Sequence, residues 1–392
     1  MDFDPATHPH RRYNPLTNVY ILVSPHRTKR PWLGQSEPAA LSDAPRYDPA
    51  CYLCPGNTRT GGEKNGDYEH TMVFENDYPA ILPPPGPTAP SVVHPLLVAE
   101  PVQGACDVVC FHPRHDLSFP TLGLDDVVKI VEEWIHVYAR RGAQSGIEYV
   151  QIFEVLLYAQ VHVNIENWSQ NKGAMMGCSN PHPHSQVWSL TTVPTLPAKE
   201  LTNLRNYATN TSVSTDAPKG PNNHPCLLCE YVHHELSALE PERIVVTNDH
   251  FVALVPWWAY WPFEVMISPH RRHIPSMVHF TEEEKIAFAD IMRRVSIRYD
   301  NLFECSFAYA MGIHQRPLPP RKVDGVIEED EGDIAHFHVH FEPPLLRSAS
   351  VRKFMAGFEV MGEPQRDLTA EQAAKRLQDC SEVHYSTFRN DS

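Results

Sequence analysis

Apolar residues recur at helical spacing in two long segments of the chain. The first stripe comprises Leu124, Val127, Val128, Val131, Trp134, Ile135 and Tyr138, and the second Ile286, Ala289, Met292, Val295 and Tyr299. A repeat of three to four residues gathers such side chains on one face of an α-helix. Thr281 and Glu284 form the capping-box pattern that opens a helix. We therefore predict two amphipathic helices, with a shorter third helix around residues 369–377.

Runs of β-branched and aromatic residues predict the strands. These runs are "VYILV", "TMVFE", "YVQIF", "SQVWSL", "IVVTN" and "FAYAM". The most apolar run, residues 251–267, is too short for a membrane span and is broken by Pro256, Pro262 and Glu264, so we expect buried strands there. Proline-rich "PPPGPTAP" and "RPLPPRK", and the polar residues 206–223, are predicted linkers and loops. Antiparallel sheets with covering helices indicate the α+β class.

The second half of the chain repeats the first. The first half contains, in order, "CYLC", "TMVFENDYPAIL", "VVCFHPRHDL", an amphipathic helix and "NPHPHSQVW". The second contains "CLLC", "RIVVTNDHFVALVP", "VMISPHRRHI", a helix and "HFHVHFEPP". Matched landmarks in the same order indicate an internal repeat. We predict two related halves, residues 1–195 and 196–392, each an antiparallel sheet with a covering helix.

The formal charge of −15 argues against a general nucleic-acid binder, because phosphate backbones select basic surfaces. Positive charge is nevertheless concentrated in "SPHRTKRP", where Arg27, Lys29 and Arg30 lie close together. Such a cluster suits an anionic small molecule, although a solvated loop is the simpler interpretation of the cluster alone. The polar amino terminus has no apolar targeting segment, so we expect a cytoplasmic protein with no membrane partner.

The nine cysteines include two close pairs, which in a reducing compartment favour metal ligation over disulfides. Cys51 and Cys54 have zinc-ligand spacing, and His115 and His182 are the best donors to complete a tetrahedron. A closed set of four ligands leaves no position for substrate, so such a zinc would be structural. The second half offers a similar set, drawn from Cys226, Cys229, His273 and the "HFHVH" histidines. An unpaired buried cysteine remains the alternative for each thiol.

The histidines of "HFHVHF" and "PHPH" follow strand alternation. In a strand His336, His338 and His340 share one face, and His182 and His184 are spaced in the same way. A solvated strand face would be the simpler interpretation of one such pair. The same spacing after a cysteine pair in both halves favours a functional interpretation.

If His182 binds zinc, His184 is free for chemistry on the same face. A neutral imidazole can attack phosphorus when its other ring nitrogen donates to a fixed acceptor. Gln186, two residues further along that face, can donate its amide to the phosphoryl oxygens as charge develops on them. A neutral donor favours keeping the phosphoramidate for a second acceptor over immediate hydrolysis.

At these residues the chain resembles the galactose-1-phosphate uridylyltransferase family of the histidine-triad superfamily. The resemblance extends through "HPHRRYNPLT", "ILVSPHRTKRPW", "NKGAMMGCSNPHPHSQVW", "PWWAYWPFE", "IRYDNLF", "PPLLRSASVRKFMAGFE" and "QRDLTAEQAAKRL". It implies two histidine-triad-like halves that together form a large half-barrel-like sheet. It also implies transfer of a uridylyl group from UDP-glucose to galactose 1-phosphate through a uridylyl-histidine at His184, with Gln186 stabilising the phosphoryl charge.

The resemblance also implies the substrate-binding residues and a homodimer. The matching positions are Arg27 and Arg30 for phosphate, Asn76 and Asp77 for the nucleoside, Asn171, Gly177, Cys178 and Ser179 before the histidines, and Lys353, Phe354, Phe358, Glu359 and Gln365 in a hexose-phosphate segment. That last segment is expected to reach the active site of the partner subunit.

The same resemblance implies two metal sites. The structural zinc would bind Cys51, Cys54, His115 and His182 in the first half. A second metal, iron or zinc, would bind Glu200, His273, His338 and His340. The internal repeat suggests another second set, in which Cys226 and Cys229 replace Glu200 and His340.

Two features depart from the family pattern. Phe358 stands where tyrosine is common, which would remove one hydroxyl contact and cost about 0.5–1.5 kcal/mol. Residues 155–170 separate "VQIFE" from "NKGAMMGCSNPHPH", which are continuous in the family. The segment is either a loop extension or a retained in-frame intron, and we expect it to displace residues 171–179.

Other functions fit parts of the pattern. A histidine-triad hydrolase or dinucleoside-polyphosphate phosphorylase would use the same nucleophile, but Gln186 disfavours the hydrolase and the full-length resemblance disfavours both. A zinc-stabilised binding module, with only structural histidines, would form no covalent adduct.

Overall fold

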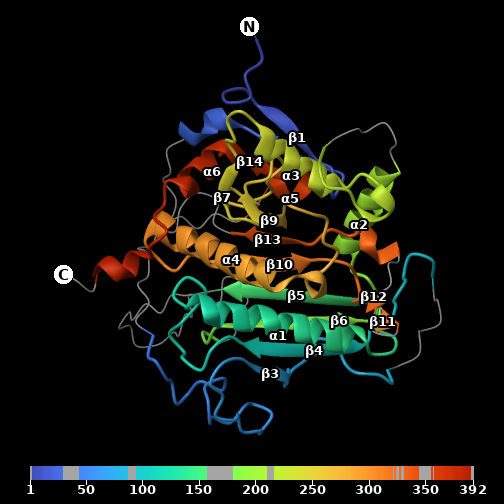
Figure 1. The fold of residues 1–392 in the computed structure, drawn as a ribbon, viewed down its shortest axis with the longest axis vertical. Helices are drawn as coiled ribbons and strands as arrows, with labels where there is room; N and C mark the ends of the chain where they lie inside the picture. The colour runs from blue at the N-terminus through green and yellow to red at the C-terminus, as the bar shows by residue number, and fades with distance from the viewer. Residues whose placement is uncertain are drawn as a thin grey trace.

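The computed structural model confirms an α+β fold (Figure 1). It describes residues 2–29, 44–86, 94–156, 180–209, 216–320, 322–323, 326–327, 331–343, 355 and 357–389. Most of the segment 155–170 lies outside these ranges. Within them, no helix has both the length and the apolar character needed to cross a bilayer.

A nine-stranded sheet joins the two halves of the chain. Its order is β3-β4-β6-β5-β10-β13-β9-β8-β7, and every neighbouring pair is antiparallel. The strands are β3 (Met72–Glu75), β4 (Gly104–Cys110), β5 (Tyr149–Leu156), β6 (His184–Leu190), β7 (Ile244–Thr247), β8 (Phe251–Leu254), β9 (Val265–Pro269), β10 (Tyr309–His314) and β13 (His338–Glu342). The halves meet where β5 pairs with β10, with Phe153 opposite Gly312. The sheet is therefore continuous across the internal repeat.

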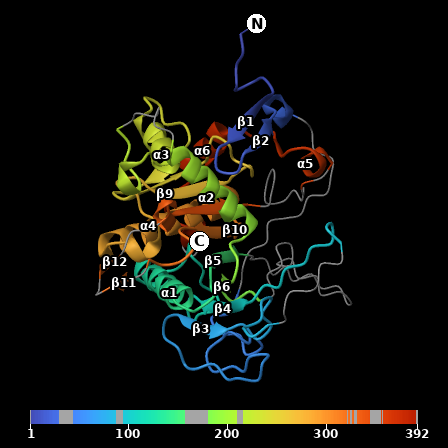
Figure 2. The same cartoon turned by 90° about the vertical axis from the view of Figure 1, so that its right-hand side faces the viewer.

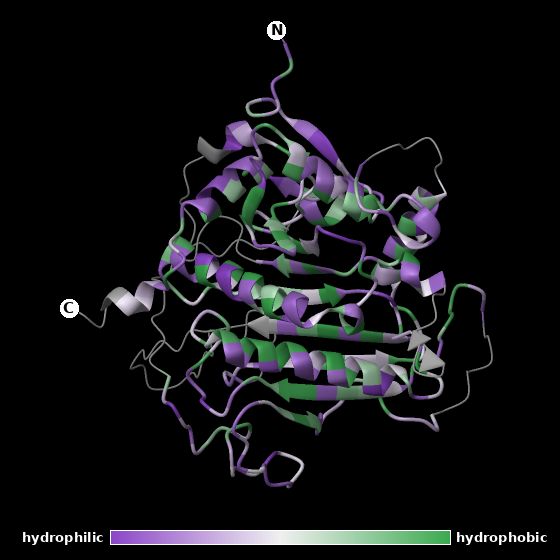
Figure 3. Cartoon of the chain, in the orientation of Figure 1, coloured by the Kyte–Doolittle hydropathy of each residue, from purple (hydrophilic) through white to green (hydrophobic). Residues whose placement is uncertain are grey.

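Two long helices lie side by side across one face of this sheet (Figure 1). Helix α1 (Leu124–Gly142) covers β5 and β6, and α4 (Glu282–Phe303) covers β7 and β8. The predicted stripes are largely confirmed, and Trp134 and Tyr299 are fully buried against the strands, but Ile286 in the first turns of α4 is 49% exposed, so its place in the stripe was wrong. Figure 3 shows apolar and polar stripes on both helices. Because burying a large apolar side chain contributes about 1.5–3 kcal/mol, these stripes fix the covered face.

Helix ends follow the sequence signals. Thr281 and Glu284 form both hydrogen bonds of the predicted capping box at the start of α4. Asp125 and Asp126 lie in the first turn of α1 and Arg140 and Arg141 in its last, which complements the helix dipole.

The remaining strands and α-helices lie outside the nine-stranded sheet (Figures 1 and 2). They are β1 (His10–Asn14), β2 (Val19–Val23), β14 (Gln365–Arg366), β11 (Lys322–Val323), β12 (Val326–Ile327), α2 (Thr195–Ala208), α3 (Leu227–Ser237), α5 (Phe358–Met361) and α6 (Ala370–Gln378). Helix α6 confirms the third predicted helix. Helices α2 and α3 are additions to the predicted elements, and α2 continues to Ala208, inside the segment predicted as a loop.

Partly buried ion pairs connect the last α-helix to the amino-terminal strand and to the second half of the chain. Glu371 of α6 accepts hydrogen bonds from Arg12 of β1 at 3.0 Å and from Arg243 at 2.9 Å. The guanidinium of Arg12 lies over the ring of Trp257, 3.7 Å from its centroid. Strand β14 pairs in parallel with β2, so segments more than 300 residues apart form one small sheet.

Candidate active site and metal groups

Strand β6 turns alternate side chains to opposite faces of the sheet. Val187 and Ser185 are buried beneath α1, where the indole N–H of Trp134 donates to Ser185 Oγ at 2.8 Å. His184, Gln186 and Trp188 therefore point to the face that α1 does not cover.

The ring of His184 is oriented by the backbone. Its Nδ1–H donates to the carbonyl oxygen of His182 at 2.7 Å. Nε2 is then the nitrogen that carries the lone pair. Burial lowers the pKa of His184, so the ring is neutral and nucleophilic. This geometry is the one expected for a histidine that attacks phosphorus.

Gln186 is oriented by its neighbour on the same face. The indole N–H of Trp188 donates to Gln186 Oε1 at 2.9 Å. With the oxygen so occupied, the amide NH₂ is directed away from Trp188 and is available as a donor. Trp188 packs edge to face on Phe153, with ring centroids 5.3 Å apart, which fixes the indole.

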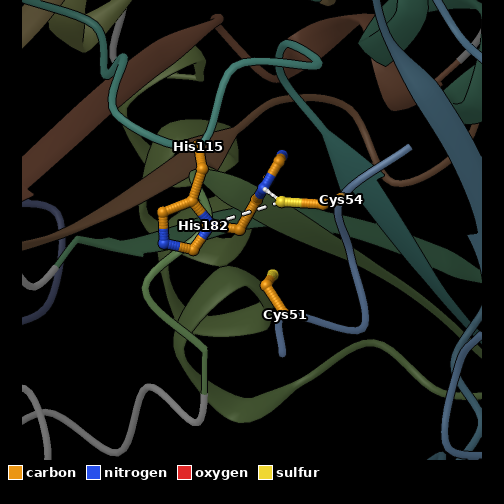
Figure 4. A group of neighbouring side chains, drawn as sticks. All are labelled: Cys51, Cys54, His115 and His182. Atoms are coloured by element: carbon orange, nitrogen blue, oxygen red, sulfur yellow. Dashed lines mark hydrogen bonds between the residues drawn. The ribbon is translucent and has the colours of Figure 1, made fainter. Parts of the chain in front are cut away.

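The first metal group contains Cys51, Cys54, His115 and His182 (Figure 4). All four are buried. Cys54 Sγ lies 3.6 Å from Nδ1 of His115 and 3.6 Å from Nδ1 of His182. A tetrahedral zinc with bonds of about 2.3 Å to sulfur and about 2.1 Å to nitrogen would separate such atoms by about 3.6 Å. The structure thus brings together the set expected for the structural zinc.

Hydrogen bonds behind this group fix the orientation of His182. Its Nε2–H donates to the carbonyl oxygen of His112 at 2.9 Å, which leaves Nδ1 facing the thiols. A hydrogen bond from the ring nitrogen that faces away from the metal orients a metal-binding histidine. Burial lowers the pKa of His182 to about 3 and raises that of Cys54 to about 12. A neutral imidazole suits a cation, and a buried thiolate requires one.

The second metal group contains Glu200, His314, His338 and His340. His314, on β10 opposite His338, takes the place expected for His273. Its Nδ1 lies 2.7 Å from Glu200 Oε2, and His338 Nε2 lies 3.8 Å from the same oxygen. In the described ranges, neither His338 Nε2 nor either ring nitrogen of His340 has a hydrogen-bond partner. Buried nitrogens without partners fit a site that binds a cation.

Electrostatics within the second group are consistent with that role. Burial acts to raise the pKa of Glu200, but His314, His338 and His340 outweigh it and lower the pKa to about 2. Burial lowers the pKa of His340 well below its usual value. The carboxylate is therefore charged and the His340 ring neutral, the forms that ligate a metal.

His273 lies in a third group, with Cys226, Cys229 and His336. His336, expected on one face with His338 and His340, precedes β13 and turns towards the cysteines. Neither of the two alternative sets is therefore complete as predicted: the Glu200 group has His314 in place of His273, and the cysteine group has His336 in place of His338. The structure contains two separate groups, which share no residue.

A cleft of about 520 Å³ opens on the uncovered face of the sheet. Glu200, His314 and His340 line it, with Phe153 and Trp261 among its apolar walls. Register connects this cleft to the nucleophile strand, because Gln186, Phe153, Gly312 and His340 are neighbours across β6, β5, β10 and β13. Gly312 carries no side chain that would fill the middle of this row.

Two of the substrate residues suggested by resemblance lie together. Arg27 Nη1–H donates to Gln365 Oε1 at 2.8 Å, and Asp367 lies 3.6 Å from Arg27 Nε. Asn76 and Asp77 directly follow β3.

Others lie on α5 or outside the described residues. Phe358 on α5 is 57% exposed, and Glu359 lies 3.4 Å from Arg366 Nη1. The following lie outside the described residues: Arg30, Asn171, Gly177, Cys178, Ser179, Lys353 and Phe354.

Sequence reasoning missed two residues of this face, His314 and Trp188. The alternation of Ala310, Gly312 and His314 along β10 could have placed His314 on the uncovered face. Trp188 lies two residues after Gln186 and four after His184, so strand alternation could have placed it on the same face.

Comparison with family models agrees with the resemblance. Residues 1–156 and 157–194 match the galactose-1-phosphate uridyl transferase N-terminal domain, and residues 200–389 match its C-terminal domain. The break in the first match falls inside the segment 155–170.

Similar proteins share nearly the whole chain. The galactose-1-phosphate uridylyltransferase of Kluyveromyces lactis is 47% identical over 98% of this chain and 97% of its own, and that of Saccharomyces cerevisiae is 44% identical over 98% of each. A solved uridylyltransferase structure is 27% identical, with a TM-score of 0.65 over 95% of this chain and 98% of its own. An ADP-glucose phosphorylase from Arabidopsis thaliana, 21% identical, shares the fold with a TM-score of 0.65 over 95% of this chain and 100% of its own.

Proposed function

The chain belongs to the galactose-1-phosphate uridylyltransferase family, and from that premise we propose how it carries out the family's reaction. It transfers a uridylyl group from UDP-glucose to galactose 1-phosphate, giving UDP-galactose and glucose 1-phosphate. The reaction belongs to galactose metabolism. The observation that carries the mechanism is the 2.7 Å hydrogen bond from His184 Nδ1–H to the His182 carbonyl.

His184 is the nucleophile of a double displacement. Nε2 attacks the α-phosphorus of UDP-glucose, the P–N bond forms, and the bond to the β-phosphate oxygen breaks. Glucose 1-phosphate leaves with that electron pair. The ring, now substituted at Nε2, carries positive charge that its Nδ1–H shares with the His182 carbonyl. A phosphate oxygen of galactose 1-phosphate then attacks the same phosphorus and releases His184.

Gln186 stabilises the charge that develops on the phosphoryl oxygens. Its amide NH₂ is the donor, and the Trp188 indole holds the amide oxygen on the other side. A neutral donor has no acidic proton to give to a leaving group, which suits transfer to a second sugar phosphate over hydrolysis.

Cys51, Cys54, His115 and His182 would hold a structural zinc. A closed set of two thiolates and two imidazoles gives zinc four protein ligands and no substrate position. A zinc bound there would hold His182, whose carbonyl orients His184, and would thereby help to fix the position of that backbone oxygen. Glu200, His314, His338 and His340 would hold the second metal, iron or zinc, which would stiffen the wall of the cleft.

Substrate is bound by residues from two subunits of a homodimer. Gln365 lies on β14 and Phe358 and Glu359 lie on α5, away from β6 (Figure 1), and the resemblance implies that this segment reaches the partner's active site. Arg27, which donates to Gln365, binds phosphate. Asn76 and Asp77 bind the nucleoside. The reaction takes place in the cytoplasm, where the cysteine pairs stay reduced.

Incubation with UDP-glucose labelled in the uridylyl group tests this function. We expect an acid-labile, base-stable adduct in the wild-type protein and none in His184→Asn. Release of free UMP at the rate of adduct formation would indicate a hydrolase. Absence of any adduct from folded wild-type protein would favour a binding module whose histidines are structural.

A further inference from the structure

We propose that Cys226, Cys229, His273 and His336 form a third metal site, a structural zinc that is separate from both sites of the family pattern. One ligand atom from each residue lies within 4.8 Å of the others. Cys229 Sγ is 3.8 Å from His336 Nε2 and 4.0 Å from His273 Nδ1. A bound zinc would draw these atoms to about 3.6 Å, a small contraction.

The surroundings of the group match those of a closed zinc site. Cys226, Cys229 and His336 are each at most 5% exposed. The set offers two sulfur and two nitrogen donors, which is a standard composition for structural zinc. With four protein ligands it leaves no open position, so the metal would support structure and would not bind substrate.

His273 is held in the tautomer that a zinc ligand requires. Its Nε2–H donates to the carbonyl oxygen of Asp333 at 2.8 Å, which turns Nδ1 towards Cys229. His182 has the same arrangement, with Nε2 bonded to the His112 carbonyl and Nδ1 facing Cys54. Each group therefore contains one imidazole whose Nε2 is held by a backbone carbonyl and whose Nδ1 faces a thiol.

The internal repeat places the two groups at equivalent positions. In each half a Cys-x-x-Cys precedes a histidine that follows a strand, β4 for His115 and β9 for His273. The fourth ligand comes two residues before a histidine whose Nδ1 bonds its carbonyl. His184 Nδ1 lies 2.7 Å from the His182 carbonyl, and His338 Nδ1 lies 2.8 Å from the His336 carbonyl.

This equivalence assigns the site a structural task. In the first half the zinc holds the residue that orients the nucleophile. In the second half it would hold His336, whose carbonyl orients His338, a member of the second metal group. The zinc would also join the start of α3 to the segments beside β9 and β13, which are distant in sequence.

Mercurial titration of the full-length protein tests the proposal without a mutation. An organomercurial displaces zinc bound by thiolates, and a metallochromic dye measures the zinc released. We expect zinc from both cysteine pairs in equal amounts, and none from the Glu200 group, which has no thiolate. Release that matches the Cys51 and Cys54 pair alone would overturn the proposal.

Variants assign the released zinc to its ligands. His336→Asn and the double change Cys226→Ser with Cys229→Ser should each lose one zinc per chain by elemental analysis, while Cys305→Ser, a buried thiol outside the groups, loses none. Cobalt-substituted protein should lose half of its thiolate-to-cobalt absorbance in the double variant. Unchanged zinc and cobalt signals in folded variants would refute the site. If the double variant does not fold, the zinc content of His336→Asn and the mercurial titration still show whether the site binds zinc.

Discussion

Replacing Trp188 by phenylalanine tests whether the Gln186 amide acts through a fixed orientation. The change removes the indole N–H that donates to Gln186 Oε1 at 2.9 Å, and keeps an aromatic ring against Phe153. The amide is then free to rotate, so its donor group faces the phosphoryl oxygens for only part of the time. We expect a lower kcat with little change in KM.

The size of the effect follows from the bond that is lost. A neutral hydrogen bond contributes about 0.5–1.5 kcal/mol, which corresponds to a decrease in kcat of about 2- to 10-fold. Removing the donor itself, in Gln186→Ala, should cost about 1.5–3 kcal/mol because the acceptor is charged, or about 10- to 150-fold.

A double-mutant cycle distinguishes orientation from a general structural effect. If Trp188 acts through Gln186, adding Trp188→Phe to Gln186→Ala should reduce kcat no further. Trp257→Phe, a matched change in the second half of the chain, should leave kcat unchanged. Equal losses from Trp188→Phe with and without Gln186 would refute the reasoning, as would an unaltered kcat in the single variant.

Three further predictions concern stability and metals. His182→Ala should lose one zinc per chain by elemental analysis and have a lower melting temperature. His184→Asn should keep the wild-type zinc content and melting temperature. Equal melting temperatures of the two variants would contradict a structural zinc at His182. Burial acts to raise the pKa of Glu371, but Arg12 and Arg243 lower it to about 2, so its contribution to stability is present above the ordinary value of 4.5 and lost as pH falls towards about 2. Glu371→Gln should therefore unfold more easily in urea near neutral pH, by up to about 3 kcal/mol, with the difference shrinking in acid; a constant difference would exclude the ion pair as its cause. Glu200→Ala should lose the second metal and retain all mercurial-releasable zinc, and loss of that zinc would show that the groups are interdependent.

The fold follows closely from patterns that are local in sequence. The stripe from Leu124 to Tyr138 and the capping box at Thr281 placed both covering helices, because apolar period and end signals depend on neighbouring residues. Helices α2 and α3 begin without a side-chain cap, and buried polar residues such as Glu200 and Glu235 interrupt the apolar residues on their inner faces.

The metal groups show where sequence reasoning ends. The paired cysteines and the repeat brought Cys51, Cys54, His115 and His182 together without knowledge of the fold. His314 could not be assigned in the same way, because its contact with His338 depends on the register between β10 and β13. His336 was assigned to the strand face because the start of β13 could not be placed to within two residues.

Isotope exchange measures the central claim most directly. Wild-type protein given UDP-glucose and labelled glucose 1-phosphate, with no galactose 1-phosphate present, should move label into UDP-glucose, because the uridylyl group rests on His184 between the two half-reactions. His184→Asn should show no exchange while keeping its zinc and its melting temperature. Exchange at the wild-type rate in that variant, or no exchange in the active wild-type enzyme without the second sugar phosphate, would contradict the account.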